Sequence, residues 1–485
     1  LTVGLKTPEG RFYIEPYASG QVRYYAFYSK KDVAPEAFTD ASCGFNDQIH
    51  EEHFGEEHQR GNTEALSFRS FSGASLPLRT YRMAAACTGE FAQNQGGTMD
   101  DVLGAYATIF NRLNEVLQTE SSVSMELVPN NDQLIHLNPG TDPFNSANQG
   151  LVLLNQIAGY LNGAIGLNSY DIGHIFTGGC TDVGGVAGGG VCTLNKGRAV
   201  TCFSSSNLVF TAQGTLAHEV GHQFSVGHSW SNCPGNMDQL SSANAYEPGS
   251  GTTIMSYAGA CGNQNIAFRD PYYNVGSLED LIGYSRVGTG ATCGTETITE
   301  NHEPEIQMPY ESGFFIPIST PFELSATATD EDGDNLTYIW EQFDLGPVSP
   351  IGDPIGNAPL FRSFSPSANG NTRVFPRMDK IINNDFDNTE VLPTYSRDLT
   401  LQFVVRDNNI NHGSAVWQPV SFQSDETAGP FVVLTGNGTG VTWTGGEYRE
   451  VTWDVANTTN PRVNCQYVDV LLSVDGGFTY PYTLL

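Results

Sequence analysis

The sequence predicts an α+β region, followed by all-β sandwich modules. Between residues 76 and 300, runs with apolar residues at helical spacing alternate with short runs of strand pattern. From about residue 300 the helical runs stop, and short strand-like runs separated by turns follow one another. The expected parts are a β-rich segment over 1–75, the α+β domain over 76–300, a β-sandwich over 301–425 and a second, incomplete β module over 426–485.

The composition is typical of an exported protein. The 485 residues include 22 basic and 53 acidic ones, a net charge of −31, which disfavours nucleic acid and anionic membrane surfaces as partners. No apolar run approaches the length of a membrane span, and the first residues, LTVGLKTPEG, lack the features of an export signal. The nine cysteines form no CxxC pair, which favours disulfides outside the cell. We expect a secreted monomer.

Strands and helices are expected to alternate through the α+β region. The helix over 98–118 has Thr98 as its expected N-cap, because its hydroxyl can accept a hydrogen bond from the first turn, where acidic residues follow. The closing helix over 277–287 is expected to be capped by Ser277. The other expected elements are strands within 76–91, 122–129 and 169–178, and helices over 145–166 and 207–220.

The run HEVGHQFSVGH at residues 218–228 is the strongest chemical signal in the chain. On a helix, His218 and His222 lie one turn apart on the same face and can reach the same ion. Glu219 lies beside them, where its carboxylate can bond a water molecule. This HExxH pattern is typical of zinc sites in which the glutamate is the base. His228 comes too late to continue the same helical face, so the chain must turn before it.

The pattern HExxHxxxxxH, followed by a methionine turn in TTIMSYAG, resembles the metzincin zinc endopeptidases, and among them the bacterial adamalysin/reprolysin-like M12-type members. The resemblance implies a metzincin-like mixed sheet with an active-site helix. It also implies zinc held by His218, His222 and His228, with one position left for water. Glu219 would be the catalytic base and Met255 the apolar floor of the site. Protein or peptide chains would be the substrates.

Three further positions bear on this resemblance. Astacins and serralysins carry a tyrosine where Tyr257 stands, so Tyr257 is either an auxiliary ligand or transition-state donor, or an aromatic side chain packed near the cleft. Ser225 stands where the family usually has glycine. Because serine is disfavoured at positive φ, the turn is expected to shift toward Gly227. Ser229 follows the third histidine, where the adamalysin branch usually has aspartate.

The N-terminal segment contains a possible inhibitory element. Cys43-Gly44 is similar to the propeptide motif of adamalysin-like and matrix zymogens, in which a cysteine thiolate binds the catalytic zinc and excludes water. Cys43 is therefore a candidate inhibitory zinc ligand and a candidate for the thiol that an odd number of cysteines leaves over. The alternative is an ordinary disulfide partner. The polar run over 61–75 is a candidate cleavage junction.

Four other histidines are interpreted as structural. His50, His53 and His58 lie in the acidic run HEEHFGEEH, where a solvated loop is favoured over a second metal site. His174 lies within an expected strand, where a packed or hydrogen-bonded histidine is commoner than a ligand.

Two disulfides are expected around the site. Cys233 follows the zinc motif and Cys261 follows the methionine turn, so a bridge between them would join the two walls of the site. Cys180 with Cys202 is the second expected pair. Spacing alone does not give the remaining connectivity.

Two segments are candidates for contact with substrate. The resemblance implies that residues 184–191 form part of an edge strand that binds extended substrate antiparallel, with main-chain pairing as the recognition mode. The alternative is a rigid loop held by a disulfide. Residues 267–275 are expected to shape the pocket for the side chain that follows the scissile bond.

The C-terminal half is expected to form Ig-like modules similar to the accessory domains of secreted bacterial proteases. The run DEDGDNLTYIW resembles a signature of PKD- or cadherin-like domains. Its carboxylates Asp330, Asp332 and Asp334 are hard oxygen ligands suited to calcium, and Asp407 and Asn408 are candidates to share that ion. The alternative is an acidic turn without metal.

The most concrete interpretation is a secreted zinc endopeptidase that still carries an inhibitory prosegment. One rival is an adhesive or binding protein in which the Ig-like modules dominate and the metal site is structural or silent. A gluzincin, in which a distant glutamate is the third ligand, is disfavoured because His228 and Met255 are both present.

Overall fold

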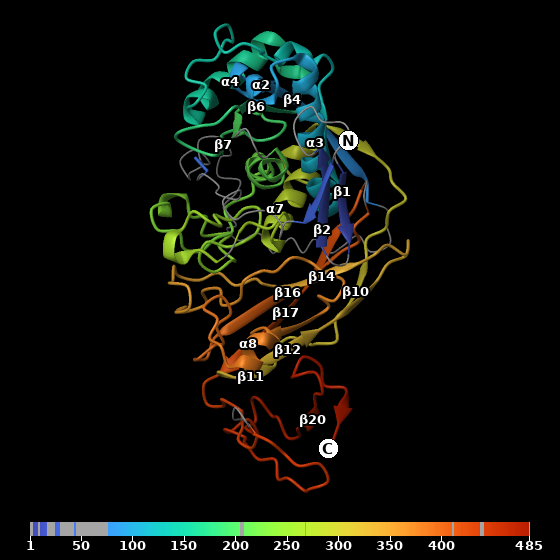
Figure 1. The fold of residues 1–485 in the computed structure, drawn as a ribbon, viewed down its shortest axis with the longest axis vertical. Coiled ribbons are helices and arrows are strands. Elements are labelled where there is room, and N and C mark those ends of the chain that lie inside the picture. The colour runs from blue at the N-terminus through green and yellow to red at the C-terminus, as the bar shows by residue number, and fades with distance from the viewer. Residues whose placement is uncertain are drawn as a thin grey trace.

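The computed structural model describes residues 3–7, 10–16, 25–29, 43–44, 76–203, 208–266, 268–409, 412–436 and 441–484. An α/β part lies at one end of the molecule and a β-rich part lies beneath it, with the C-terminal residues at the far end (Figure 1). Within the described ranges, every helix is too short or too polar to span a bilayer.

A mixed six-stranded sheet forms the centre of the α/β part, as predicted. Its strands lie in the order β5-β4-β6-β8-β7, and β9 pairs with the start of β4. The strands β5, β4, β6 and β8 are mutually parallel, whereas the edge strand β7 is antiparallel to β8. The bounds are Leu78–Cys87 (β4), Val123–Leu127 (β5), Ile172–Thr177 (β6), Gly185–Ala187 (β7), Ala199–Cys202 (β8) and Thr295–Thr297 (β9).

Helices cover both faces of this sheet. They are α2 (Gly89–Gln95), α3 (Met99–Ser121), α4 (Gly150–Ala164), α5 (Leu208–Thr211), the π-helical turn η6 (Ala212–Leu216), α6 (Ala217–Gln223) and α7 (Val275–Arg286). Successive side chains of β4 point to opposite faces. Tyr81, Met83 and Ala85 therefore share one core with α2, α3, α6 and α7, while Ala84 and Ala86 share the other with α4.

Two of the predicted helix starts are tested by hydrogen bonds. The Thr98 hydroxyl accepts from the Asp101 backbone N–H at 3.2 Å, which confirms the predicted cap of α3. The predicted start of the next helix at residue 145 is wrong. The helix α4 begins at Gly150, whose N–H donates to the Asp182 carboxylate at 2.8 Å, and this capping group comes from a loop more than thirty residues later.

The predicted cap of α7 is also wrong. The helix begins at Val275, and the Asn274 side chain accepts from the Gly276 N–H at 2.9 Å. Ser277 is already inside the first turn, and its hydroxyl is buried without a hydrogen-bond partner among the described residues. The amide of Asn274 also donates to Glu341 at 3.1 Å, so the cap is tied to the β-rich part.

Short 3₁₀ turns complete the α/β part. They are Asn131–Leu134, Leu167–Ser169, Met237–Gln239, Gly262–Gln264 and Thr289–Thr292.

Three disulfides hold the loops of the α/β part. The two predicted bridges, Cys233–Cys261 and Cys180–Cys202, are both present. A third, Cys192–Cys293, was not predicted and joins positions 101 residues apart. All nine cysteines lie in the described ranges, and those outside disulfides are Cys43 and Cys87, which are buried, and Cys465, which is exposed.

The described N-terminal residues include three strands, as expected for a β-rich segment. The strands β1 (Val3–Thr7), β2 (Gly10–Pro16) and β3 (Tyr25–Ser29) form an antiparallel sheet beside α3 (Figure 1). The hydroxyl of Tyr13 on β2 donates to Gln213 at 3.0 Å, in the π-helical turn that leads into α6. Interpretations of other N-terminal residues lie outside the described ranges, namely those of His50, His53, His58 and the run 61–75.

The β-rich part contains a four-stranded sheet in the order β11-β17-β16-β14 and the two-stranded pairs β12-β15 and β10-β13. The short strand-like runs predicted after residue 300 are confirmed as strands. Their bounds are Glu305–Gln307 (β10), Phe315–Pro317 (β11), Phe322–Ser325 (β12), Thr327–Thr329 (β13), Thr337–Gln342 (β14), Thr372–Phe375 (β15), Asp398–Arg406 (β16) and Ala415–Asp425 (β17). The helix α8 spans Met378–Asn383.

The last residues form only two-residue strands. They pair as β18 (Val432–Val433) with β19 (Trp453–Asp454) and as β20 (Leu471–Leu472) with β21 (Tyr482–Thr483). The assignment of the β-rich part and of these residues to Ig-like modules stays a prediction.

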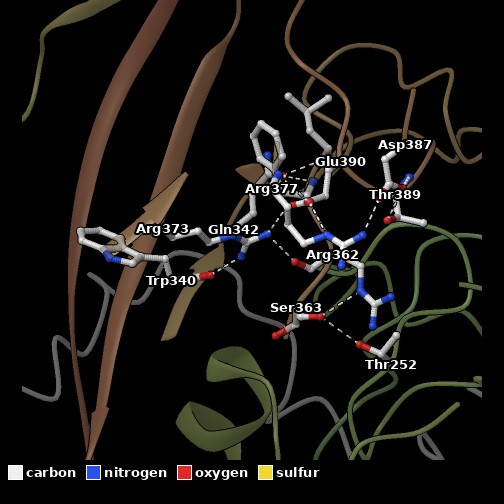
Figure 2. Close-up of polar contacts among 12 residues, drawn as sticks. Thr252, Trp340, Gln342, Arg362, Ser363, Arg373, Arg377, Asp387, Thr389 and Glu390 are labelled. Atoms are coloured by element: carbon white, nitrogen blue, oxygen red, sulfur yellow. Dashed lines mark hydrogen bonds and ion pairs between the residues drawn. The ribbon is translucent and has the colours of Figure 1, made fainter. Parts of the chain in front are cut away.

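The α/β part and the β-rich part share a buried polar interface. The fully buried Arg406 donates to the Tyr273 carbonyl at 3.0 Å and lies 3.5 Å from the carboxylate of Glu120 on α3. The Thr252 hydroxyl, near the methionine turn, donates to the Ser363 carbonyl at 3.4 Å (Figure 2). The β-rich part therefore supports the loops that lead to and from the methionine turn.

Candidate metal centre and active site

The helix that carries the first two histidines is built from α5, η6 and α6 in succession. His218 and His222 are one turn apart on α6, and both are buried. Their Nε2 atoms are 3.1 Å apart, as expected for two side chains that point to the same place from one helical face.

The chain turns toward the third histidine at Ser225, not at Gly227 as the sequence predicted. Ser225 adopts a left-handed conformation with φ of 65°. Its N–H donates to the His222 carbonyl at 2.8 Å, and the Val226 N–H donates to the Gly221 carbonyl at 3.0 Å. These bonds end the helix in spite of the steric cost of a Cβ atom at positive φ. Gly227 is needed for a different reason, because a Cβ there would lie 2.4 Å from Asn244 Oδ1.

The three imidazoles converge through their Nε2 atoms. Nε2 of His222 is 3.1 Å from Nε2 of His218 and 3.1 Å from Nε2 of His228. Each Nδ1 atom faces a backbone carbonyl, at 2.8 Å for His218 with Ile254, 2.8 Å for His222 with Val226, and 2.7 Å for His228 with Gln239. A proton on each Nδ1 leaves three Nε2 lone pairs pointing at one another.

This donor set fits zinc. Nitrogen ligands at about 2.0–2.1 Å in a tetrahedral arrangement are roughly 3.3 Å apart, close to the observed separations. Zinc needs neutral imidazoles, and burial together with the neighbouring histidines holds the pKa of His218 well below its usual value. The carbonyls that accept from Nδ1 fix the ring orientations, as partners of metal-bound histidines commonly do.

The predicted methionine floor lies directly against the active-site helix. Met255 is fully buried, and its sulfur is so close to Gly221 that a Cβ on the glycine would be 2.6 Å from it. Tyr273 also lies against this helix, and its hydroxyl donates to the Ala217 carbonyl at 2.6 Å.

Glu219 is buried beside the three histidines, under the edge strand β7. A Cβ atom on Gly185 of that strand would be only 2.5 Å from Glu219 Oε1. Burial raises the pKa of Glu219 to about 8, while a hydrogen bond from Cys43 and the positive charge of Arg269 oppose the rise. Its Oε1 atom has no hydrogen-bond partner within the described part of the chain. Burial thus makes this carboxylate a stronger base than an exposed glutamate.

Cys43 lies at the same centre. A ligand atom from each of Cys43, His218, His222 and His228 lies within 4.8 Å of every other. The Cys43 thiol donates to Glu219 Oε2 at 3.6 Å. Cys43 bridges Gly185 in parallel orientation, and the Gly44 N–H donates to the Gly185 carbonyl at 2.9 Å.

Comparison with known proteins shows that the α/β part is similar to a known family. A family model described as "Metallo-peptidase family M12B Reprolysin-like" matches residues 78–281. Residues 78–281, called the metallopeptidase domain below, are similar to this family. A search of curated proteins found no match. The converging histidines, Glu219 and Met255 all lie inside the metallopeptidase domain, and Cys43 lies before it.

Tyr257 packs into the centre of the metallopeptidase domain. Its ring lies 4.7 Å from that of His228 and 5.3 Å from that of Trp230, measured between ring centroids. Its hydroxyl donates to the Cys43 carbonyl at 3.3 Å and also to the side chain of Gln239. In this state the hydroxyl is engaged with the N-terminal segment, and both predicted roles of Tyr257 stay predictions.

The edge strand of the metallopeptidase domain is where the sequence placed a substrate rim. Gly184–Val191 contains β7, and β7 is the last strand of the sheet order. In the predicted pocket segment, Arg269 donates to the Ser256 carbonyl at 2.9 Å. The charge of Arg269 lowers the pKa of Glu219, although no local pattern had distinguished Arg269 from its neighbours.

Outside the metallopeptidase domain, the predicted calcium ligands are brought together only in part. Asp330, Asp332 and Asp334 form a group of carboxylates, so calcium at this turn stays a prediction. Asp407 lies outside this group, and its carboxylate accepts from the Ser414 N–H and hydroxyl and from Asn301, so its share in calcium binding stays a prediction.

The other predicted calcium ligand is also engaged elsewhere. The side-chain amide of Asn408 donates to the Asn335 and Arg406 carbonyls at 2.6 and 3.0 Å. The acidic group also has a protein partner, because Asp332 accepts from the His302 ring at 2.9 Å.

His174 is a packed residue, as predicted. It is fully buried on β6, with Nε2 2.8 Å from the Thr201 hydroxyl and Nδ1 3.2 Å from the Gln223 amide oxygen. Burial lowers its pKa to about 4, so the ring is neutral. It connects the sheet to the end of the active-site helix.

Two residues that sequence reasoning missed, Gln239 and the buried Glu247, also act on the site. Gln239 accepts from His228 through its carbonyl and from Tyr257 through its side chain. Glu247 accepts hydrogen bonds around the methionine turn. Neither residue has a fixed spacing from the HExxH motif that would single it out, because both lie in the irregular loop between His228 and Met255.

Proposed function

We propose that this chain is a secreted zinc-dependent endopeptidase that hydrolyses internal peptide bonds in proteins. The observation that carries the proposal is the convergence of three imidazole Nε2 atoms beside the buried Glu219. Zinc at this position would supply Lewis-acid polarisation of the scissile carbonyl and lower the pKa of a water molecule. The match to the M12B metallopeptidases supports the same chemistry.

Glu219 is the general base and acid of the proposed reaction. Its carboxylate accepts the proton that the attacking water molecule loses, and it then delivers this proton to the leaving amine nitrogen. Burial makes this carboxylate a stronger base than an exposed glutamate, which favours the first of these transfers. The main chain of β7 positions an extended substrate by strand pairing.

We expect Glu219→Ala to abolish turnover while the protein still binds zinc. The loss in kcat/KM should be about 10²- to 10⁴-fold, the usual contribution of a positioned acid–base group. The measurements are peptide or casein cleavage and zinc content, made in a Cys43→Ala background so that Cys43 does not occupy the site. Glu126→Ala, which alters an exposed carboxylate on β5, is the control and should keep full activity.

Near-normal cleavage by Glu219→Ala would contradict the assigned role. A casein zymogram of the same proteins with and without a chelator separates a protease from an adhesive protein with a silent metal site. Activity that disappears with the chelator and returns with added zinc supports the proposal.

We further propose that Cys43 holds the enzyme in an inactive zymogen form. Its thiol is buried, takes no part in a disulfide and belongs to the same ligand group as the three histidines. Thiolate is a common zinc ligand and would occupy the position that water needs. The same thiol also contacts Glu219 at 3.6 Å, so it engages the base as well. The parallel pairing with Gly185 runs opposite to the expected direction of a substrate.

We expect Cys43→Ala to raise the activity of the full chain roughly tenfold or more, the ratio produced when a blocked form is favoured by about 1.4 kcal/mol or more. The matched control is Cys465→Ala, which removes an exposed cysteine that forms no disulfide. The initial rate of peptide cleavage, measured before any proteolysis of the N-terminal segment, checks the prediction. Equal rates for wild type and both variants would reject the inhibitory role.

A further inference from the structure

Glu247 is a buried carboxylate in the loop between the third histidine and the methionine turn. Its side chain is 1% exposed, although it has no cationic partner among the described residues. Such a group requires hydrogen bonds from every side to remain charged in the interior. Glu247 accepts five hydrogen bonds, which come from three residues.

The two carboxylate oxygens divide these bonds between two segments. Oε1 accepts from the Thr252 N–H at 2.7 Å, the Thr253 N–H at 3.2 Å and the Thr252 hydroxyl at 3.3 Å. Oε2 accepts from the Ser229 hydroxyl at 2.5 Å and the Thr253 hydroxyl at 2.5 Å. One side chain thus joins the residue that follows His228 to the two threonines that lead into the methionine turn.

The backbone makes the same connection. The Ser229 N–H donates to the Met255 carbonyl at 3.1 Å, and the Glu247 N–H donates to the Ser229 carbonyl at 2.9 Å. In the same turn, the carbonyl of Ile254, the residue just before Met255, faces Nδ1 of His218 at 2.8 Å. The positions of the first and third histidines therefore both depend on where the segment from 252 to 255 lies.

The space around the carboxylate is closed. A Cβ atom on Gly251, which has φ of 65°, would lie 2.9 Å from Glu247 Oε2. Thr252 and Thr253 are fully buried, so their N–H groups have no access to water. Without the carboxylate these donors lose their partner, and the turn must move to find another.

We infer that Glu247 is a positioning residue that sets the relative placement of His228 and the methionine turn and so maintains the metal-binding geometry. The inference rests on the proposed zinc chemistry of the three histidines. Glu247 does not touch the reacting atoms. It acts through Ser229 on one side and through Thr252 and Thr253 on the other.

The test measures the metal directly. Zinc-loaded full-length chain is mixed with an excess of a chromogenic chelator, and the rate of zinc release is followed. A cobalt(II)-substituted sample gives the visible absorption spectrum, which reports coordination geometry. We expect Glu247→Ala to release zinc about 10- to 100-fold faster than wild type, the usual effect of removing a partner outside the ligands themselves. Its cobalt spectrum should shift.

Glu247→Gln is the rescuing variant. Its amide oxygen can still accept from the two backbone N–H groups, and its NH₂ group can donate to the Ser229 and Thr253 hydroxyls after these rotate. We expect its zinc release rate and cobalt spectrum to be close to those of wild type.

Glu390→Ala is the matched control in the β-rich part. Glu390 is also buried, and its carboxylate accepts from Arg373 at 2.8 Å and from the Arg377 N–H at 3.0 Å (Figure 2). This variant should lower the unfolding temperature and leave zinc release unchanged. If Glu247→Ala behaves like Glu390→Ala in both measurements, Glu247 only stabilises the fold and the inference is wrong.

Milder variants keep the test decisive if Glu247→Ala does not fold. Ser229→Ala and Thr253→Val each remove one hydroxyl donor, and both should speed zinc release. Unchanged release in both would overturn the inference alone. A wild-type chain that takes up no zinc would overturn the proposed function, and the inference with it.

Discussion

Ser225 shows how a single residue can depart from the preferred backbone conformation at a functional site. Its φ of 65° lies in the region that favours glycine, and its buried hydroxyl has no hydrogen-bond partner among the described residues. This left-handed conformation of Ser225 ends α6 and directs the chain so that His228 reaches His218 and His222. The steric preference of serine predicted that the turn would shift toward Gly227. The hydrogen bonds that end the helix at Ser225 outweigh this preference.

We expect Ser225→Gly to stabilise the protein by about 1 kcal/mol, because glycine adopts this φ without the clash of a Cβ atom. The neighbouring Gly227→Ala is the contrasting variant. It should destabilise the protein, since its Cβ would lie 2.4 Å from Asn244 Oδ1 and 2.5 Å from Ser241 Oγ. The unfolding temperatures of the two variants check both signs. Destabilisation by Ser225→Gly would contradict this account of the turn.

At the scale of elements, the helix α7 depends on groups from outside its own sequence. The Asn274 side chain caps the Gly276 N–H, and its amide donates to Glu341. Glu341 in turn accepts from the Val275 N–H at 2.8 Å. The first turn of the helix is therefore satisfied partly by a strand that follows more than fifty residues later. A carboxylate near a helix N-terminus is also favoured by the helix dipole.

We expect Asn274→Ala to destabilise the protein by about 1–2 kcal/mol, because it removes the cap and one buried hydrogen bond. Ser277→Ala should change stability much less, since the Ser277 hydroxyl has no partner to lose within the described ranges. Denaturant unfolding of both variants against wild type measures the difference. A larger loss of stability in Ser277→Ala than in Asn274→Ala would instead support Ser277 as the cap of α7.

At the scale of the whole molecule, the metallopeptidase domain and the β-rich part are joined through buried charge. Glu341 lies at this junction, and burial raises its pKa to about 7. Glu247 adds to the rise by repulsion, while Arg406 and hydrogen bonds from Ser363 and Val275 oppose it. Since the usual value is 4.5, the folded protein retains this proton between about pH 4.5 and 7, whereas the unfolded chain has released it.

The stability contributed by protonated Glu341 should therefore decrease as pH rises from 4.5 to 7 and then level off. The total change is roughly 3 kcal/mol. We expect Glu341→Gln, which does not titrate, to lack this decrease. The difference in unfolding free energy between wild type and Glu341→Gln, measured from pH 4.5 to 7.5, checks the prediction. A constant difference across this range would show that Glu341 keeps an ordinary pKa in the folded protein.

Patterns within one element were sufficient for much of the fold. The cap of α3 by Thr98 and the strand runs after residue 300 agree with the sequence predictions, and the mixed sheet agrees with what the resemblance implied. The spacing of His218 and His222 places both on one face of α6, because helical periodicity fixes which side chains lie together.

Several contacts between distant segments were not predictable. Asp182 caps α4, Cys192 pairs with Cys293, and Glu247 bonds both sides of the methionine turn. Each of these contacts depends on the path of an irregular loop, and that path follows from packing of the whole chain rather than from a local repeat.

The sequence by itself determined which residues can bind a metal and which helix carries two of them. Only the tertiary structure decided how the third histidine reaches them and that Cys43 lies at the same centre. Periodicity acts within a single helix or strand, whereas the meeting of Cys43 with His228 depends on long-range packing.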